Sequence, residues 1–318
     1  MLEYFLIAFV GFAVTVGIMP VLSKFLKKKG IVSYDKHKNT GEQIPEWGGL
    51  GIFIGFVVSM LAASMLTGFI QIIWISISIV FLCTVIGMLD YILHLMDLQK
   101  VMLPLLVAIP FVIIQPVSTE IVFPFIGTID FGIWYYIVLV PLAITGACNA
   151  INMLAGLNGL EAGNSLVILT GSTILFLIAD NTNSLVLSIA MIGPIIGFLV
   201  YNKYPAKIFP GDVGTFAMGG LIAMVAIFSK LEFFIAIMMI PQFIEFFLKL
   251  RSRFKAENFG NIKGSILTSP YTAKYSLTHF FYSENRFNEK EIVYKLWIFQ
   301  AVFILLAVSL FIWGGFKL

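Results

Sequence analysis

The sequence predicts an all-α integral membrane protein with about ten transmembrane helices. Of its 318 residues, 59% are hydrophobic and only 12% are charged, and the mean hydropathy is +0.98. Soluble domains carry about twice that share of charge, roughly 25%. An apolar run of about 20 residues spans a bilayer, and such runs recur from one end of the chain to the other.

Ten apolar runs each predict one membrane helix, to within a few residues at either end. The first run is too long for the core of a signal peptide and follows no basic segment, so it is expected to be a span. Prolines inside the runs are tolerated better in membrane helices than in soluble ones. No linker or repeat divides the chain, which predicts a single domain over 1–318. The ten runs cover 2–25, 48–66, 69–90, 101–116, 132–153, 164–179, 183–201, 214–229, 231–250 and 292–314.

The basic residues predict the orientation of the chain. Alternate connections between the runs hold 18 of the 20 Lys and Arg residues. The positive-inside rule places these connections in the cytoplasm and both termini outside. One of the opposite connections, 117–132, alternates apolar and polar residues and contains Gly127, which predicts a short extracytoplasmic β-hairpin.

The stretch NAINMLAGLNGLEAG, residues 149–163, gathers three asparagines, three glycines and a glutamate where the fifth run ends. Asn149 and Asn152 are three residues apart and share one face of a helix. Gly156 is suited to ending that helix, and Asn158-Gly159 predicts a tight turn. A single asparagine in a membrane helix most often joins helices by hydrogen bonding, but this concentration of polar residues favours a binding site.

The other connections predicted to be cytoplasmic carry acids at the ends of runs. YDKHKNTGEQIPEWGGLG, 34–51, contains Asp35, Lys36 and Glu46, whereas Asp90 ends the third run and Asp212 begins the eighth. Each acid alone has an ordinary alternative as an interfacial residue wetted by headgroups. Ionisable groups at membrane helix ends are nevertheless functional candidates, and their convergence on one face favours a common site there.

Carboxylates and amides without a histidine cluster favour Mg²⁺ over zinc, with Mn²⁺ as an alternative. Mg²⁺ held by one or two protein groups usually completes its shell with substrate phosphates and water. Glycine turns let backbone amides approach a diphosphate. Phe209 is either a stacking partner for a base or an ordinary membrane-interface aromatic. The residues therefore predict a magnesium-dependent phosphate site at the cytoplasmic face, where a cytosolic donor meets a lipid acceptor.

Three stretches resemble motifs of the polyprenyl-phosphate N-acetylhexosamine-1-phosphate transferases. They are NAINMLAGLNGLEAGNSLV, YNKYPAKIFPGDVGTF and GMLDYILHLMDLQK, which ends at Lys100. The resemblance covers nearly the whole chain. AGLNGLEAG is similar to the dolichyl-phosphate N-acetylglucosamine-1-phosphate transferase branch of eukaryotes and archaea, whereas bacterial branches carry a DGLDGL-like version. The last cytoplasmic loop is too short for the extra folded insertion of the eukaryotic relatives, which favours an archaeal-type enzyme.

The resemblance implies transfer of N-acetylglucosamine 1-phosphate from UDP-N-acetylglucosamine to dolichyl phosphate, with release of UMP. This reaction is the first membrane step of lipid-linked oligosaccharide assembly for protein N-glycosylation. The implied location is the cell membrane, or the endoplasmic reticulum membrane if the source is eukaryotic, and the implied assembly is a homodimer. Another UDP-N-acetylhexosamine or polyprenyl phosphate remains an alternative.

The resemblance also implies residue roles. Asn152 and Asp212 would hold Mg²⁺, and Asp90, Lys100 and Asp212 would be catalytic. Asn158 and Phe209 would face the uracil, and Asn149 the lipid phosphate. The residues expected to bind substrate are Asp35, Lys36, Glu46, Asn149, Asn158, Phe209, Arg251, Arg253 and Lys263.

The chain departs from the family pattern in two places. Tyr91 stands where the family usually has a second acid, and Asp97 is a candidate to compensate. The last loop has basic residues without the family's histidine- or arginine-rich signature, so Arg251, Arg253, Lys255 and Lys263 are either diphosphate ligands or positive-inside anchors.

Other functional classes fit the sequence less well. The net charge of +3 is too small to predict nucleic-acid binding. The two cysteines, Cys83 and Cys148, lie within apolar runs and predict neither a disulfide framework nor a zinc site. A nucleotide-sugar or lipid-phosphate transporter is the rival from another class, but transporters place polar groups near the bilayer midplane, often in repeated halves. An inactive relative is the third reading, because of Tyr91.

Overall fold

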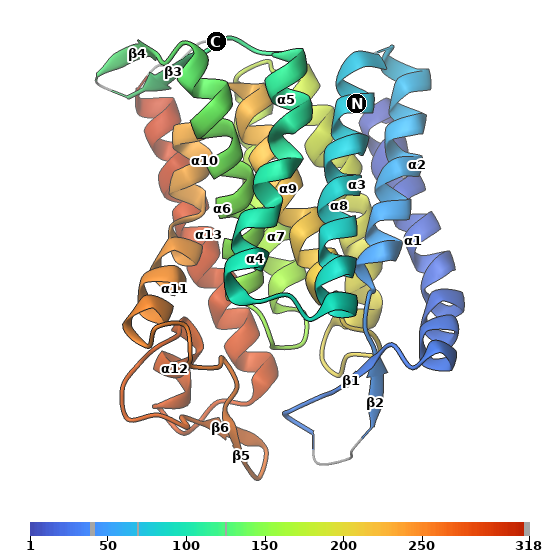
Figure 1. Ribbon diagram of the computed structural model, residues 1–318, viewed down its shortest axis with the longest axis vertical. Coiled ribbons are helices and arrows are strands. Elements are labelled where there is room, and N and C mark those ends of the chain that lie inside the picture. The colour runs from blue at the N-terminus through green and yellow to red at the C-terminus, as the bar shows by residue number, and fades with distance from the viewer. Residues whose placement is uncertain (39–41, 69, 125, 315–318) are drawn as a thin grey trace.

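The computed structural model describes residues 1–38, 42–68, 70–124 and 126–314, and each predicted apolar run is helical within them (Figure 1). The helices are α1 (Leu2–Lys29), α2 (Gly49–Thr67), α3 (Ile70–Leu93), α4 (Asp97–Met102), the 3-10 helix η1 (Leu103–Ala108), α5 (Ile109–Ile114), the π-helix η2 (Tyr135–Leu139), α6 (Val140–Met153), α7 (Leu160–Ile178), α8 (Thr182–Asn202), α9 (Gly211–Ser229), α10 (Glu232–Met238), α11 (Ile240–Arg251), α12 (Leu277–Tyr282) and α13 (Glu289–Trp313). The strands are β1 (Val32–Tyr34), β2 (Gln43–Pro45), β3 (Glu120–Phe123), β4 (Gly127–Asp130), β5 (Asn261–Lys263) and β6 (Ile266–Thr268).

The protein is a multi-pass integral membrane protein, and most of the about ten predicted spans form long apolar helices. Among the described residues, eight helices are long and apolar enough to cross a membrane. The number is nine if α10 and α11, which meet at a bend of 61°, form one broken span. The run 101–116 instead forms a shorter apolar helical stretch, Leu98–Ile114, which is built from most of α4 with η1 and α5. Pro104 and Pro110 lie in the first turns of η1 and α5, where proline interrupts the backbone hydrogen bonding of the preceding helix.

Helix α9 forms the centre of the bundle. In the most apolar 18 residues of α9, 89% are buried, whereas the corresponding share is 28% in α1 and in α13 at the periphery. It packs mainly against α3 and α6, so the acids at the ends of α3 and α9 and the asparagines of α6 come from neighbouring helices.

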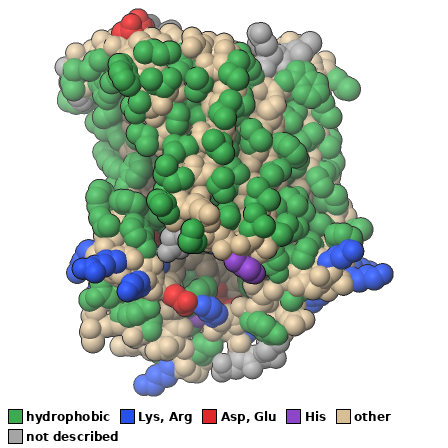
Figure 2. Space-filling view, viewed as in Figure 1, with side chains coloured by type: hydrophobic (Ala, Val, Ile, Leu, Met, Phe, Trp, Pro, Cys, Tyr) green, Lys and Arg blue, Asp and Glu red, His purple; other side chains and the backbone are tan. Residues whose placement is uncertain are grey.

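Among the described residues, three antiparallel hairpins lie at the two ends of the bundle (Figure 1). β3 and β4 pair from Glu120 opposite Asp130 to Phe123 opposite Gly127, which confirms the hairpin predicted near 117–132. They lie at the same end as the N-terminus and the last residues of α13, whereas β1–β2 and β5–β6 lie at the other end. On the face in Figure 2 the Lys and Arg side chains gather at this second end, below a mostly hydrophobic surface that covers the body of the bundle.

Candidate active site

Lys100 joins two carboxylates that come from different spans. Its Nζ lies 2.7 Å from Asp90 Oδ2 and 3.8 Å from Asp212 Oδ2. Asp90 is near the end of α3, Lys100 is in the short helix α4, and Asp212 is in the first turn of α9, where the helix dipole favours a negative charge. The three residues predicted to be catalytic are therefore in direct contact.

Two glycines allow this approach. A Cβ atom at Gly87 of α3 would lie 2.4 Å from the backbone nitrogen of Val213, and one at Gly49 of α2 would lie 2.2 Å from that of Gly214. Both distances are too short for any larger side chain. Glycine at these positions lets α2 and α3 pack directly onto the first turn of α9, beside Asp212.

Asn152 is held beside Asp212 through Thr215. The Thr215 hydroxyl donates to Asn152 Oδ1 at 3.1 Å and lies 3.3 Å from the backbone oxygen of Asp212. The pair predicted to hold magnesium is thus aligned by a residue one helical turn after Asp212. Asn149, one turn earlier on α6, donates from Nδ2 to Thr145 O at 2.9 Å.

A polar cavity of about 280 Å³ lies between the first loop, the asparagine-glycine turn and the start of α9. Six residues predicted to bind substrate or metal line it: Asp35, Lys36, Glu46, Asn152, Phe209 and Asp212. Phe209 is fixed there because its backbone nitrogen donates to Pro45 O at 2.8 Å and its oxygen accepts from Gly48 N at 2.8 Å.

A larger apolar groove of about 930 Å³ lies between α4, α6 and α11. Its lining is mostly apolar and includes Met153, Phe243 and Phe246, with Lys100 and Asn149 among its polar residues. Asn152 and Gly156 line both this groove and the polar cavity. Figure 2 shows a hollow near the basic end of the molecule, where the hydrophobic surface of the bundle meets acidic, basic and histidine side chains.

A third cavity, of about 420 Å³, joins the first two. It is lined by Glu46, Asp90, Lys100 and Asp212, among others. Glu46 and Asp212 are shared with the polar cavity, and Lys100 is shared with the apolar groove. The Asp90–Lys100–Asp212 group therefore lies where a polar cavity and an apolar groove meet.

Burial affects Asp35 and Glu46, the acids of the first loop that line the polar cavity, differently. Burial raises the pKa of Asp35, but hydrogen bonds from Asn158 and the His37 backbone, with the Lys38 ammonium, bring it below its ordinary value. Burial raises the pKa of Glu46 above its ordinary value, and the hydrogen bond from Ser33 Oγ at 2.7 Å offsets this only in part. Asp35 is thus a stable carboxylate, whereas Glu46 takes up a proton more readily.

Asn158 does not point into the polar cavity in this conformation. Its side chain is buried, Nδ2 donates to Asp35 Oδ2 at 3.0 Å, and its backbone nitrogen donates to Glu289 Oε1 at 2.6 Å. The neighbouring residues Gly156 and Leu157 line the cavity instead. Asn158 therefore holds the wall of the polar cavity, whereas the sequence-based expectation was direct contact with uracil.

The basic residues of the last loop are spread over different surfaces. Arg251, Arg253 and Lys255 line a separate open cavity of about 400 Å³. Arg253 and Lys255 also line the apolar groove. Lys263 is exposed at the end of β5 and is not among the described residues that line these cavities. The structure brings Arg253 to the site, but not Arg251 or Lys263.

Tyr91 packs against the mouth of the third cavity. Its ring meets that of Trp47 edge-on, with centroids 5.3 Å apart, and both residues line this cavity. Asp97 begins α4, but its side chain lies outside the described residues, so its compensating role stays a prediction.

Two residues of the site were missed by sequence reasoning. Thr215 had a usable signal, because a hydroxyl one turn after Asp212 shares its helix face. Phe259 lines both the polar cavity and the apolar groove, but it comes from the last loop, and no local pattern distinguishes it from other loop aromatics.

The donor atoms at the junction suit a hard cation. Asp90 and Asp212 offer carboxylate oxygens and Asn152 an amide oxygen, and oxygen is the ligand atom that Mg²⁺ prefers. Asp90 Oδ1 is buried and has no hydrogen-bond partner among the described residues. A buried carboxylate oxygen without a partner is costly, and a bound cation would satisfy it. The residues present therefore fit magnesium.

Comparison with known proteins identifies the family. The model of glycosyl transferase family 4 matches residues 71–230. The chain is 35% identical over 309 residues to a Saccharolobus solfataricus protein named "Putative UDP-N-acetylglucosamine--dolichyl-phosphate N-acetylglucosaminephosphotransferase", covering 95% of this chain and 94% of the relative. A Sulfolobus acidocaldarius protein of the same name is 34% identical, over 94% and 93% of the two chains.

A bacterial relative extends the comparison. The phospho-N-acetylmuramoyl-pentapeptide-transferase of Halalkalibacterium halodurans is 30% identical over 331 residues, covering 95% of this chain and 96% of the relative. These matches confirm the resemblance drawn from the motifs. The chain belongs to glycosyl transferase family 4, among the polyprenyl-phosphate N-acetylhexosamine-1-phosphate transferases.

Proposed function

We propose that this protein transfers N-acetylglucosamine 1-phosphate from UDP-N-acetylglucosamine to dolichyl phosphate, as a single domain over 1–318. The observation that carries the proposal is the position of Asp90, Lys100 and Asp212 where the polar cavity meets the apolar groove. A nucleotide sugar suits the first space and a prenyl chain the second, so the two substrates would meet at these charges. The names of the archaeal relatives support the choice of substrates.

The reaction is a direct in-line displacement. An oxygen of the lipid phosphate attacks the sugar-linked phosphorus of the diphosphate and forms the new P–O bond. The P–O bond to the bridging oxygen breaks, and UMP leaves with that oxygen and its electron pair. A phosphate monoester with a second pKa of about 6 is already largely ionised at neutral pH, so no strong general base is needed.

The residues of the junction would act mainly by position and charge. Phosphoryl transfer depends on alignment and neutralisation more than on covalent chemistry by the protein. Lys100 would bind a phosphate oxygen, and Asp90, paired with it at 2.7 Å, would orient the lipid phosphate or take a residual proton. Asn152 and Asp212 would hold Mg²⁺, or Mn²⁺, which when bound neutralises charge on the diphosphate.

The remaining contacts divide between the two spaces. Phe209 would stack on the uracil, and Asp35, Lys36 and Glu46 would line the nucleotide-sugar pocket, because all four border the polar cavity. Asn149 borders the apolar groove and would face the lipid phosphate.

The basic end of the molecule would face the cytoplasm, and both termini and the β3–β4 hairpin would lie outside. The positive-inside rule supports this orientation, because Lys and Arg gather at the end that carries the site. The enzyme would then act at the cytoplasmic face of the cell membrane, as a homodimer by family resemblance, in the first membrane step of N-glycan lipid assembly.

One alternative keeps the chemistry and changes a substrate. The bacterial relative is named for N-acetylmuramoyl-pentapeptide transfer, so another UDP-N-acetylhexosamine or another polyprenyl phosphate is the second candidate. A transporter is less favoured, since the polar groups lie at one end of the spans, whereas transporters bind near the bilayer midplane.

The test is UMP release by the purified protein in detergent with Mg²⁺, dolichyl phosphate and UDP-N-acetylglucosamine, with and without EDTA. Metal-dependent UMP in equal amount to a lipid-linked sugar would support the transferase, and exchange of sugar or lipid would then define specificity. Binding of the nucleotide sugar without UMP release from any acceptor would contradict the proposal and favour a carrier or an inactive relative.

A further inference from the structure

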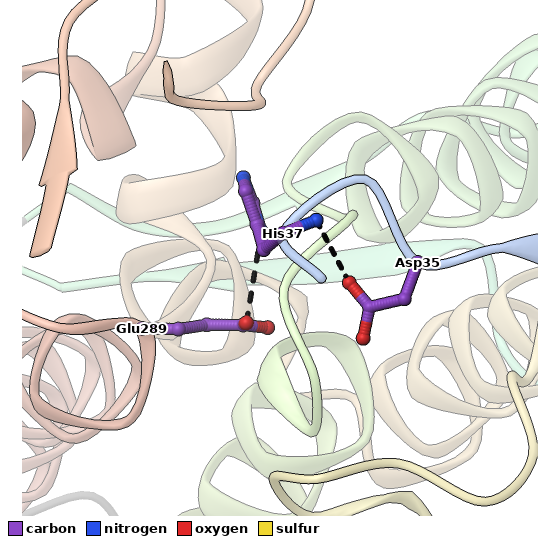
Figure 3. A group of neighbouring side chains, drawn as sticks. All are labelled: Asp35, His37 and Glu289. Atoms are coloured by element: carbon purple, nitrogen blue, oxygen red, sulfur yellow. Dashed lines mark hydrogen bonds and ion pairs between the residues drawn. The ribbon is translucent and has the colours of Figure 1, made fainter. Parts of the chain in front are cut away.

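Asp35, His37 and Glu289 form a buried cluster behind the polar cavity (Figure 3). One ligand-type atom from each lies within 4.8 Å of the others. Asp35 and His37 come from the connection between β1 and β2, and Glu289 begins α13. The side chains of His37 and Glu289 are only 1% and 4% exposed. The cluster therefore joins segments about 250 residues apart in the chain, and all three of its residues are buried.

A backbone hydrogen bond fixes the tautomer of His37. The Gly260 N–H donates to His37 Nε2 at 3.0 Å, so Nε2 must be the unprotonated nitrogen. In the neutral ring the proton is then on Nδ1. His37 Nδ1 faces Glu289 Oε2 at 3.7 Å, which is longer than a hydrogen bond, and neither atom has a hydrogen-bond partner among the described residues. The imidazole thus lies between the last loop, to which it is hydrogen-bonded, and the start of α13, which it contacts.

This donor set does not suit a metal ion. A histidine that binds a metal through Nδ1 normally carries its proton on Nε2, where Gly260 already donates. Asp35 Oδ1 accepts from the His37 backbone at 2.9 Å, and Asp35 Oδ2 accepts from Asn158 at 3.0 Å and pairs with Lys38 at 3.1 Å. The ammonium group and these hydrogen bonds already satisfy the carboxylate.

The cluster instead connects three walls of the polar cavity. Asp35 lines the cavity itself. Asn158, in the asparagine-glycine turn, bonds to both Asp35 and Glu289. The His37 ring lies 5.5 Å from that of Phe259, which lines the cavity from the last loop. Lys36 Nζ lies 4.3 Å from the same Phe259 ring. The first loop, the asparagine-glycine turn and the last loop therefore all meet at His37 and Glu289.

We infer that His37 and Glu289 are positioning residues for nucleotide-sugar binding, which hold these three segments in register around the polar cavity. The inference rests on the proposed function, because it assigns the polar cavity to the nucleoside diphosphate sugar. Neither side chain is among the residues that line the cavity, so both would act through Asp35, Asn158 and Phe259.

Substitution of His37 separates this role from general stability. His37→Leu removes both ring nitrogens, whereas His37→Gln keeps an acceptor near the position of Nε2 for the Gly260 N–H. Glu289→Gln keeps the shape and an acceptor for Asn158 but places an amide donor against Nδ1–H. Gln300→Met is the matched control, because Gln300 is an equally buried polar residue on α13 that bonds to Gln242 at 2.7 Å.

The expected result is selective loss of nucleotide-sugar affinity. His37→Leu and Glu289→Gln should raise the KM for UDP-N-acetylglucosamine and its calorimetric Kd about tenfold or more, since small misplacements of binding groups are costly. At saturating sugar kcat should stay within about twofold, as should the KM for lipid phosphate, because the Asp90–Lys100–Asp212 group is untouched. His37→Gln should recover most of the affinity, and Gln300→Met should bind like the wild type.

Several outcomes would overturn the inference. One is unchanged affinity in both His37→Leu and Glu289→Gln. Another is a fall in kcat and Tm together with a rise in the KM for both substrates. If His37→Gln did not reverse these changes, the role of His37 would be purely structural. Stoichiometric metal in the purified protein that is lost in His37→Leu would replace the inference with a metal site. If the wild type bound UDP-N-acetylglucosamine but released no UMP, only the proposed chemistry would fail; if it did not bind the nucleotide sugar, both would fail.

Discussion

Lys100 Nζ lies 2.7 Å from Asp90 Oδ2, and this contact joins a short helix to the end of a neighbouring span. The two residues are ten positions apart, with the turn at His94 between α3 and α4. The same ammonium group lies 3.8 Å from Asp212 Oδ2. A cation shared by two carboxylates can hold them together before an anionic substrate arrives, and then exchange one partner for a phosphate oxygen.

Asp212→Asn should abolish transfer while the protein stays folded. The substitution keeps the shape but removes the charge of an expected magnesium ligand. Loss of at least about 100-fold in UMP release is expected, because loss of an outer-shell partner alone costs 10–100-fold. Detergent Tm within a few degrees of the wild type would show that the fold is intact. A fully active variant would overturn the metal assignment.

Thr215→Val should weaken magnesium binding without removing a ligand. The variant is similar in shape but lacks the hydroxyl that donates to Asn152 Oδ1 at 3.1 Å. The Mg²⁺ concentration for half-maximal UMP release should rise about 10–100-fold. Thr173→Val is the control, because the Thr173 hydroxyl donates within its own helix, to Leu169 O at 2.8 Å, and has no other hydrogen bond among the described residues. An identical magnesium titration for both variants would remove Thr215 from the site.

Tyr91→Asp should be tolerated, since it restores the second acid usual in the family. The variant loses the edge-on contact with Trp47, worth about 0.5–1.5 kcal/mol, so a slightly lower Tm is expected with near wild-type kcat. Tyr91→Phe keeps the ring contact and serves as control. A variant with Asp at 91 that lost activity at normal Tm would show that the tyrosine itself has a role in transfer.

Glu46→Gln should stabilise the protein at neutral and alkaline pH. Burial raises the pKa of Glu46 in the folded state above its ordinary value of 4.5. At pH values above this raised pKa, keeping the carboxylate ionised lowers the free energy of unfolding. This loss of stability disappears as pH falls below 4.5, where the group is protonated in both states. The Tm advantage of the variant should therefore be largest at pH 8 and vanish in acid. A pH-independent difference would indicate another cause.

Thr128→Cys and Lys263→Cys should report opposite sides of the membrane. Both positions are exposed, in β4 and β5 at opposite ends of the bundle, and the two native cysteines are buried. A membrane-impermeant maleimide should label Thr128→Cys in intact cells and Lys263→Cys only after permeabilisation. The reverse pattern would place the site outside the cell.

The sequence was sufficient for the features that depend on local chemistry. Membrane insertion, the approximate position of the long helices and the β3–β4 hairpin follow from hydropathy and turn residues, which are properties of consecutive residues. Asp90, Asn152 and Asp212 could be selected because polar groups at the ends of apolar runs stand out against their neighbours. The asparagine-glycine and Gly211-Asp212 motifs also predicted the family, which the comparisons confirm.

The tertiary structure alone decided which polar groups meet. Leu98–Ile114 is shorter than the eight long apolar helices, and α10 and α11 meet at a bend of 61°. Average hydropathy along the sequence does not predict such local breaks in a helix. Asn158 turns to Asp35 and Glu289, and Phe259 crosses from the last loop into the polar cavity. These partners lie more than 100 residues apart, so their pairing depends on the paths of loops and on side-chain packing, which no local pattern in the sequence records.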